Sequence, residues 1–146
     1  MMNITSFSDY SLRVLIYLSV HGEANVSAEV IADAYDISFH HVAKAAQWLS
    51  REGYVISERG RGGGMRLSRA AAEINIGEVL RASETGTALA ECMRGDGGAC
   101  VITPSCGLKH ALAAAEEAFY AALDAFTLAD ITREKTALSE LLGLSA

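Results

Sequence analysis

The sequence predicts a mainly α-helical fold: a winged helix-turn-helix followed by a long C-terminal dimerisation helix. Two short amphipathic segments separated by a turn lie between residues 27 and 52, and a glycine-centred hairpin pattern follows at residues 54–68. An alanine-rich segment with helical spacing then covers residues 107–126. We therefore expect a winged helix-turn-helix DNA-binding domain at residues 1–82, a cysteine-containing loop at residues 83–106, and the dimerisation helix with its tail at residues 107–146.

Composition sets the broad class of the protein. Hydrophobic residues make up 51% of the 146 residues, which is ample for a core. The N-terminal residues lack the charged and apolar regions of a secretory signal, and no apolar run approaches the length needed to cross a bilayer. We therefore expect a cytoplasmic protein without a membrane partner.

The first predicted helix runs from Phe7 to Val20. Ser8 is the expected N-cap, and Asp9 lies in the first turn, where the helix dipole favours an anion. Apolar residues recur at helical spacing on one face, and the His21-Gly22 pair ends the helix.

The helix-turn-helix pair follows. Ser27 is expected to cap a short helix that ends at Ala34, and Ser38 to cap a second helix that ends near Glu52. The apolar positions of this second helix have helical spacing, and Trp48 is expected to cover the core. They are Val42, Ala45, Ala46 and Leu49.

A β-hairpin is predicted next. Residues 54–59 are strand-like, residues 60–64 (Gly-Arg-Gly-Gly-Gly) form a tight turn, and residues 65–68 return. No Gly-Lys-Ser/Thr follows the glycines, so this turn is not a phosphate-binding P-loop. Arginines at the tip of such a wing suit DNA phosphates or the minor groove.

Charge is distributed unevenly along the chain. The net charge is −6, but residues 38–69 contain six of the 12 basic residues against two acids. A local basic patch on an acidic protein can bind phosphates, and it favours DNA over a winged fold used only for protein contacts. The predicted DNA-binding residues are Ser38, His40, His41, Lys44, Arg59 and Arg61.

The C-terminal half is helical in pattern. A short helix is predicted at residues 76–82, and the long helix at residues 107–126 has a narrow apolar seam of the kind that packs along a partner helix. Another short helix is expected at residues 127–131, and residues 136–142 form a last helix or a loose tail. The seam consists of Leu108, Leu112, Ala115, Phe119, Ala122 and Phe126.

All three cysteines lie in one glycine-containing segment, with the spacing Cys92-x7-Cys100-x5-Cys106. Thiolates select zinc, copper(I) or iron–sulfur clusters. Zinc bound by three cysteines and His110 is one reading, although the CxxC pairs common in zinc sites are missing. An iron–sulfur cluster and a redox switch are the other readings. The cysteine spacing alone does not distinguish between these roles. No oxyanion motif accompanies cysteine and histidine, so we do not expect an enzyme.

Several segments resemble the iron–sulfur winged-helix transcriptional regulators, the family of the NsrR, IscR and RirA regulators. They are residues 5–13 (Thr-Ser-Phe-Ser-Asp-Tyr-Ser-Leu-Arg), the wing at 59–64, and the three cysteines before a long helix. The resemblance covers essentially the whole chain. Within the family, residues 40–44, 89–92, 100–108 and 127–130 are most similar to NsrR-type, nitric-oxide-sensitive repressors.

This resemblance implies a homodimer on a near-palindromic operator in double-stranded DNA. It also implies an iron–sulfur cluster, 4Fe–4S in preference to 2Fe–2S, bound by Cys92, Cys100, Cys106 and Asp9 of the other subunit. IscR-type proteins use a histidine three residues after the last cysteine, where this chain has Lys109.

The expected function is thus a DNA-binding repressor that senses nitric oxide through its cluster. Two alternatives remain. The seven-residue gap between the first two cysteines is nearer to RirA, so the signal could instead be iron or redox status. A metal or cluster protein that uses the winged fold for protein contacts is the other alternative.

Overall fold

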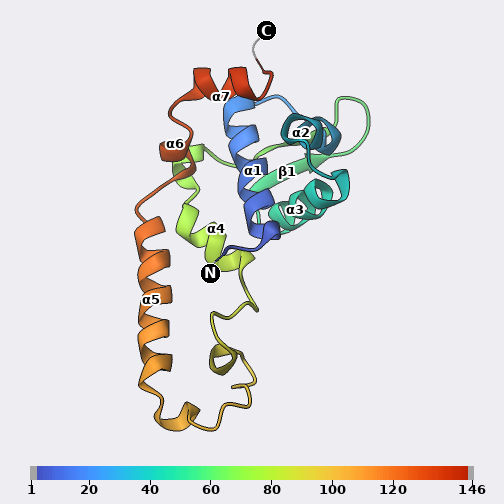
Figure 1. The fold of residues 1–146 in the computed structure, drawn as a ribbon. Coiled ribbons are helices and arrows are strands. Elements are labelled where there is room, and N and C mark those ends of the chain that lie inside the picture. Colours follow the sequence, from blue (N-terminus) through green and yellow to red (C-terminus); the bar gives the residue numbers. More distant parts are fainter. Residues whose placement is uncertain (1–2, 145–146) are drawn as a thin grey trace.

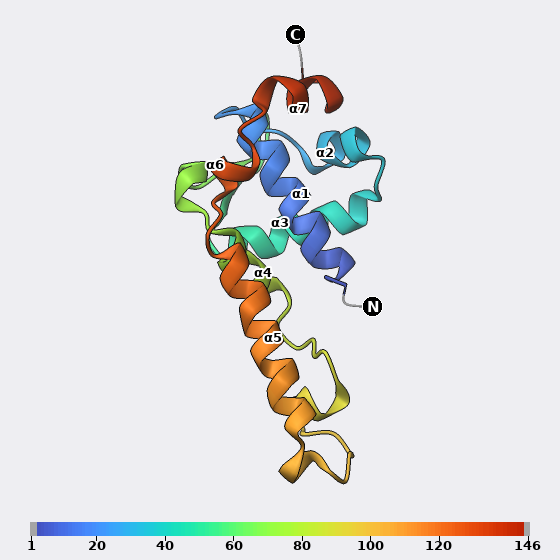
Figure 2. The ribbon, with the colours of Figure 1, turned by 60° about the vertical axis from the view of Figure 1, so that its left-hand side comes forward.

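A head and a projecting arm make up the structure, a computed structural model that describes residues 3–144 (Figure 1). The head comprises residues 3–84 and 124–144, and the arm comprises residues 85–123. Both views show the arm extending away from the head (Figures 1 and 2). The elements are α1 (Ser6–His21), α2 (Ala28–Tyr35), α3 (Phe39–Arg51), β1 (Val55–Glu58), β2 (Gly64–Leu67), η1 (Ala71–Glu73), α4 (Ile76–Ser83), η2 (Glu91–Met93), η3 (Thr103–Ser105), α5 (Gly107–Leu123), α6 (Leu128–Ile131) and α7 (Lys135–Leu141).

The N-cap of helix α1 lies three residues earlier than predicted, at Thr5 instead of Ser8. Thr5 has extended backbone, and its hydroxyl oxygen accepts a hydrogen bond from the Ser8 amide at 3.1 Å. Ser8 is instead buried inside the helix, where its hydroxyl donates to Ser83 at 2.7 Å. The prediction of Ser8 as N-cap was therefore wrong, because the cap is set by an extended residue and Ser8 faces the core.

The helix-turn-helix pair agrees closely with the prediction. The hydroxyl of Ser27 accepts the amide of Val30 at 3.4 Å and so caps α2. Ser38 occupies the N-cap position of α3, but its side chain makes no capping hydrogen bond. Asp36 adopts the left-handed conformation between the two helices (φ 51°), which tightens the turn.

The wing is a two-stranded antiparallel hairpin in which Val55 faces Leu67 and Glu58 faces Gly64. Val26 extends it as an isolated bridge, because its amide donates to the Met65 carbonyl at 3.0 Å and its carbonyl accepts the Met65 amide at 2.8 Å. Gly64 is required at this point, since its φ is +134° and a Cβ there would lie 2.7 Å from the Val26 carbonyl oxygen.

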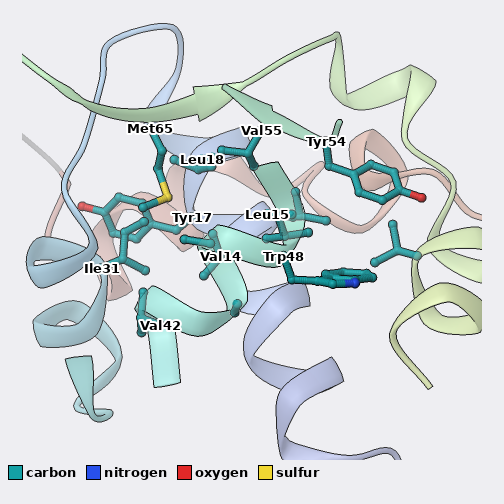
Figure 3. Packing of buried hydrophobic residues seen from close by; sticks show 14 of the residues in the cluster. Val14, Leu15, Tyr17, Leu18, Ile31, Val42, Trp48, Tyr54, Val55 and Met65 are labelled. Atoms are coloured by element: carbon teal, nitrogen blue, oxygen red, sulfur yellow. The ribbon is translucent and has the colours of Figure 1, made fainter. Parts of the chain in front are cut away.

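The core of the head lies where α1, α2, α3 and the hairpin meet (Figure 3). Leu15 from α1, Ile31 from α2 and Leu49 from α3 are fully buried. Trp48 is 9% exposed, so its predicted place in the core is confirmed. Each fully buried large apolar side chain stabilises the fold by about 1.5–3 kcal/mol.

The C-terminal segment returns to the head after α5. The Leu128 amide donates to the Ile74 carbonyl at 2.8 Å, and Ser19 on α1 shares a buried hydrogen bond of 2.9 Å with Thr132. The long helix ends at Leu123, earlier than predicted, because the carbonyl of Asp124 instead accepts the Asn75 side chain at 2.7 Å. Residues 135–141 form a helix, α7.

Candidate DNA interface and cysteine arm

Helix α3 presents one face to solvent and the other to the core. Val42, Ala45 and Leu49 are fully buried, which fixes the rotation of the helix about its axis. The four predicted DNA-reading residues of α3 are therefore on its outer side, and all four are exposed. They are Ser38, His40, His41 and Lys44.

Two aromatic residues of α1, Phe7 and Tyr10, pack against α3. The rings of Phe7 and Trp48 meet edge to face at 5.4 Å, and Tyr10 stacks on His41 at 5.3 Å. The Lys44 ammonium lies 5.6 Å from the Phe7 ring centre, within the range of a cation–π contact. The first two turns of α1 thus set the position of the α3 face that carries the predicted DNA-binding residues. The sequence analysis missed this role, although the spacing of Phe7 and Tyr10 on one helical face could have indicated it.

The wing carries arginines of two kinds. Arg59 and Arg61 are exposed at the hairpin turn, as predicted. Arg66 is an internal partner: its guanidinium lies 2.7 Å from the Glu58 carboxylate and donates to Asn25 at 3.1 Å. The hydrogen bond from Arg66, and then the one from Asn25, lower the pKa of Glu58. Arg66 therefore contributes less to the basic patch than a count of charges implies.

The cysteines lie on the arm. Cys92 is within η2 and Cys106 immediately precedes α5; both are half-buried, whereas Cys100 between them is exposed. All three are free thiols. Within residues 3–144, no three Cys, His, Asp or Glu side chains are gathered in a group that could hold a metal ion.

A tight turn shapes this segment between the first two cysteines. Gly97 and Gly98 have positive φ, and a Cβ on Gly98 would lie 2.6 Å from the Glu91 carbonyl oxygen. The Glu91 carboxylate in turn accepts the Ala99 amide at 2.9 Å. These contacts bring the chain before Cys100 back towards η2, which carries Cys92.

The donor set fits an iron–sulfur cluster or another soft metal centre. Three uncombined thiols on one glycine-rich segment provide the ligands that such a centre needs. Thr103, which lies between Cys100 and Cys106, has a buried hydroxyl oxygen without a hydrogen-bond partner in the described part of the chain. Buried hydroxyls ordinarily have partners, and a sulfur acceptor in this segment would satisfy this one.

Asp9 lies on α1 in the head, whereas His110 lies on α5 in the arm. The Asp9 carboxylate pairs with Arg13 one turn along α1 at 2.8 Å, with both side chains more than a third exposed. His110 is exposed in the first turn of α5, close in sequence to Cys106. Neither residue forms a three-donor group with the cysteines in the described chain.

Comparison with known proteins identifies the family. The sequence profile named Rrf2, described as an iron-dependent transcriptional regulator, matches residues 4–134. The chain belongs to the Rrf2 family. Among curated proteins, it is 43% identical over 142 residues to the HTH-type transcriptional regulator NsrR of Geobacillus kaustophilus, with 97% of each chain covered. It is 44% identical to NsrR of Bacillus subtilis, over 98% of this chain and 99% of that one.

Solved structures of Rrf2-type regulators have the same fold. T. potens IscR matches with a TM-score of 0.72 and 23% identity, over 91% of this chain and 88% of that one. Staphylococcus aureus CymR in its oxidised form matches with a TM-score of 0.69 and 23% identity, over 90% and 96%. These likenesses confirm the predicted winged-helix fold.

Membership of the Rrf2 family makes the chain a DNA-binding transcriptional regulator. The relatives are regulators of transcription, so the prediction that the chain is not an enzyme is confirmed. The same relatives argue against a winged fold used only for protein contacts. In the part of the chain described here, no helix has the length and apolar character needed to span a membrane.

Proposed function

We propose that this Rrf2 regulator is a repressor that senses nitric oxide through an iron–sulfur cluster, with 4Fe–4S preferred to 2Fe–2S. The ligands would be Cys92, Cys100 and Cys106 of one protomer and the partner's Asp9. The observation that carries the proposal is the set of three free thiols on one segment, in a chain about 44% identical to regulators named NsrR.

The exposed apolar residues of α5 support a homodimer. None of the 17 residues of α5 is buried, although the helix carries an apolar seam. Leu108 is 66% exposed, and Phe126, just beyond the helix, is 48% exposed. Exposed apolar surface of this kind is typical of an interface, and a second α5 would cover it.

Each part of the chain has a distinct task in this proposal. The Ser38, His40, His41 and Lys44 face of α3 would enter the major groove, while Arg59 and Arg61 of the wing would contact phosphates or the minor groove. Bound at the arm, the cluster would supply iron that nitric oxide can attack. Asp9, in the first turn of α1, would connect that site to the helix that supports α3.

Anaerobic purification tests this proposal directly. Iron and sulfide should be present with visible absorption, and nitric oxide should weaken operator binding of the loaded protein. Cys100→Ser should remove iron and sulfide, whereas Ser105→Ala, a change in the same segment that spares the thiols, should retain them. Wild-type protein without iron or sulfide would refute the proposal.

Dimerisation through α5 is tested separately. Phe119→Asp on the apolar seam should shift the protein towards monomer in sedimentation experiments and weaken operator binding. Ala121→Asp, an exposed position outside the seam, is the matched control. A Phe119→Asp protein that remains fully dimeric would place the interface elsewhere.

Iron or redox status is the second candidate signal. It is favoured by the iron-dependent description of the family and by three accessible free cysteines. Titration of loaded protein with nitric oxide, oxygen or a chelator, each followed by operator binding, separates the two. Release from DNA by chelator or oxygen, without a response to nitric oxide, would select this candidate.

A further inference from the structure

Glu84 is a buried carboxylate at the junction of the head and the arm. It is the C-cap residue of α4 and only 8% exposed. Burying an ionised carboxylate is costly unless hydrogen bonds compensate. No ion pair to Glu84 exists within residues 3–144, so neutral donors must hold it.

Those donors come from both sides of the junction. One Glu84 carboxylate oxygen accepts the backbone amide of Thr5 at 2.7 Å and the Thr5 hydroxyl at 3.0 Å. The other oxygen accepts the Thr87 hydroxyl at 3.1 Å. Burial alone would raise the pKa of Glu84, but the adjacent Ser8 hydroxyl and the hydrogen bonds from Thr5 and Thr87 outweigh burial and lower the pKa.

The residue that Glu84 holds is the cap of α1. Thr5 accepts the Ser8 amide through its hydroxyl, and its carbonyl accepts the Asp9 amide at 3.0 Å. A second contact joins the same parts, because the hydroxyl of Ser8 donates to Ser83 at 2.7 Å. The first turn of α1 is therefore attached to the end of α4, where the arm begins.

The same turn of α1 reaches the DNA-reading helix. Phe7 packs on Trp48, and Tyr10 stacks on His41, which is on the exposed face of α3. A continuous chain of contacts thus runs from residues 84–87 through Thr5 to α3. Contiguous packed and hydrogen-bonded groups of this kind carry coupling between distant sites when they have two arrangements.

We propose that Glu84 is a positioning residue that couples the state of the arm to the position of the recognition helix. This inference rests on the proposed function, since the arm must hold the sensing group. A movement of residues 84–87 either takes Thr5 with it or leaves a buried carboxylate without its donors. The second outcome is expensive, so the first turn of α1 follows the arm.

Two substitutions and one control test this role. Glu84→Gln removes the charge but keeps the shape. Thr87→Val removes the arm-side hydroxyl, which lies 3.1 Å from the Glu84 carboxylate and 2.8 Å from the Glu84 carbonyl oxygen. Glu78→Gln changes an exposed glutamate on the same helix and is the matched control. For each protein we would measure iron and sulfide content, operator affinity with and without the cluster, and hydrogen exchange of the amides of residues 5–9.

The expected result is a loss of coupling without loss of the cluster. Glu84→Gln should keep iron and sulfide but reduce the ratio of loaded to apo operator affinities by at least about fivefold. Exchange at residues 5–9 should become faster, because the Thr5 amide loses its charged acceptor. Thr87→Val should reduce the ratio less, and Glu78→Gln should match wild type.

The outcomes separate this inference from the proposed function. If wild type itself shows no difference between loaded and apo affinities, both are overturned. If wild type shows the difference and both Glu84→Gln and Thr87→Val retain it in full, only the role of Glu84 is overturned. Should Glu84→Gln fail to fold, Thr87→Val decides alone.

Discussion

The head and the arm of this regulator are built in different ways. The head has a continuous core to which α1, α2, α3, the hairpin and α6 all contribute. Across residues 85–127, all of which the structure describes, no residue is buried. The arm includes a 17-residue helix, yet its own packing supplies little stability. The head is thus stabilised by its own core, whereas the arm is anchored to it through Tyr120 and Leu123 at the end of α5, which pack against that core.

This difference has a functional meaning. A DNA-reading surface must be held rigidly, and the buried face of α3 does this. In the function proposed above, the arm is the sensing segment, and low intrinsic stability lets such a segment respond to a small chemical change. The coupling that we propose between them depends on the junction contacts of Glu84 with Thr5 and Thr87.

The largest effect is expected from a truncation in the core of the head. Leu15→Ala should lower the free energy of unfolding by about 2–5 kcal/mol, because Leu15 is fully buried. Val101→Ala on the arm, where the side chain is 91% exposed, should change it by no more than about 0.5 kcal/mol. Denaturant titration of both proteins measures the contrast. Equal losses would mean that the arm has a packed interior of its own.

The junction provides the next largest effect. A Cβ on Gly77 would lie 1.9 Å from an Asp124 carboxylate oxygen and 2.8 Å from the Asp124 amide nitrogen. Gly77→Ala should therefore force the end of α5 away from α4 and destabilise the protein by about 1–3 kcal/mol. Gly95→Ala, with open space around it, is the control. If both variants have the melting temperature of the wild type, the close approach of α4 and Asp124 is not needed for stability.

A smaller effect is expected at the wing. Arg59→Ala should weaken binding several-fold and nearly uniformly across DNA sequences, and lower the salt slope of binding by about one. Arg133→Ala removes an exposed arginine far along the chain from the wing and should leave DNA affinity unchanged. Fluorescence anisotropy at several salt concentrations measures both. Unchanged affinity of Arg59→Ala would remove this residue from the interface.

The smallest effect concerns the ion pair at the end of α5. Arg81 contacts Asp124 at 2.6 Å, and its hydrogen bond lowers the pKa of that carboxyl. A depressed pKa stabilises the fold at neutral pH, and the stabilisation is lost as pH falls through the folded-state pKa. Asp124→Asn should therefore melt below wild type at pH 7, with a difference that shrinks as the pH falls below the ordinary pKa of an aspartate. If the difference in melting temperature does not change with pH, the destabilisation comes from altered packing and not from the lost charge of Asp124.

Much of the head could be predicted because its signals are local. The helical spacing of apolar residues predicted α3 and the burial of Trp48, and the glycines predicted the turn of the wing. The cysteine spacing and the basic window located the candidate sites in the same way. Serine at a helix start is a weaker signal: Ser27 is the cap of α2, whereas Ser8 is buried and Thr5 takes its place.

By itself, the sequence determined the winged-helix fold, the exposed side of α3 and the segment that carries the thiols, because each depends on periodicity or on neighbours along the chain. Only the tertiary structure decided how these parts are joined. Thr5 meets Glu84 across 79 positions and Ser8 meets Ser83 across 75. Arg66 is paired within the wing by Glu58 and Asn25, not free for DNA. Such contacts arise when separate helices pack together, and no local pattern encodes which polar groups then meet.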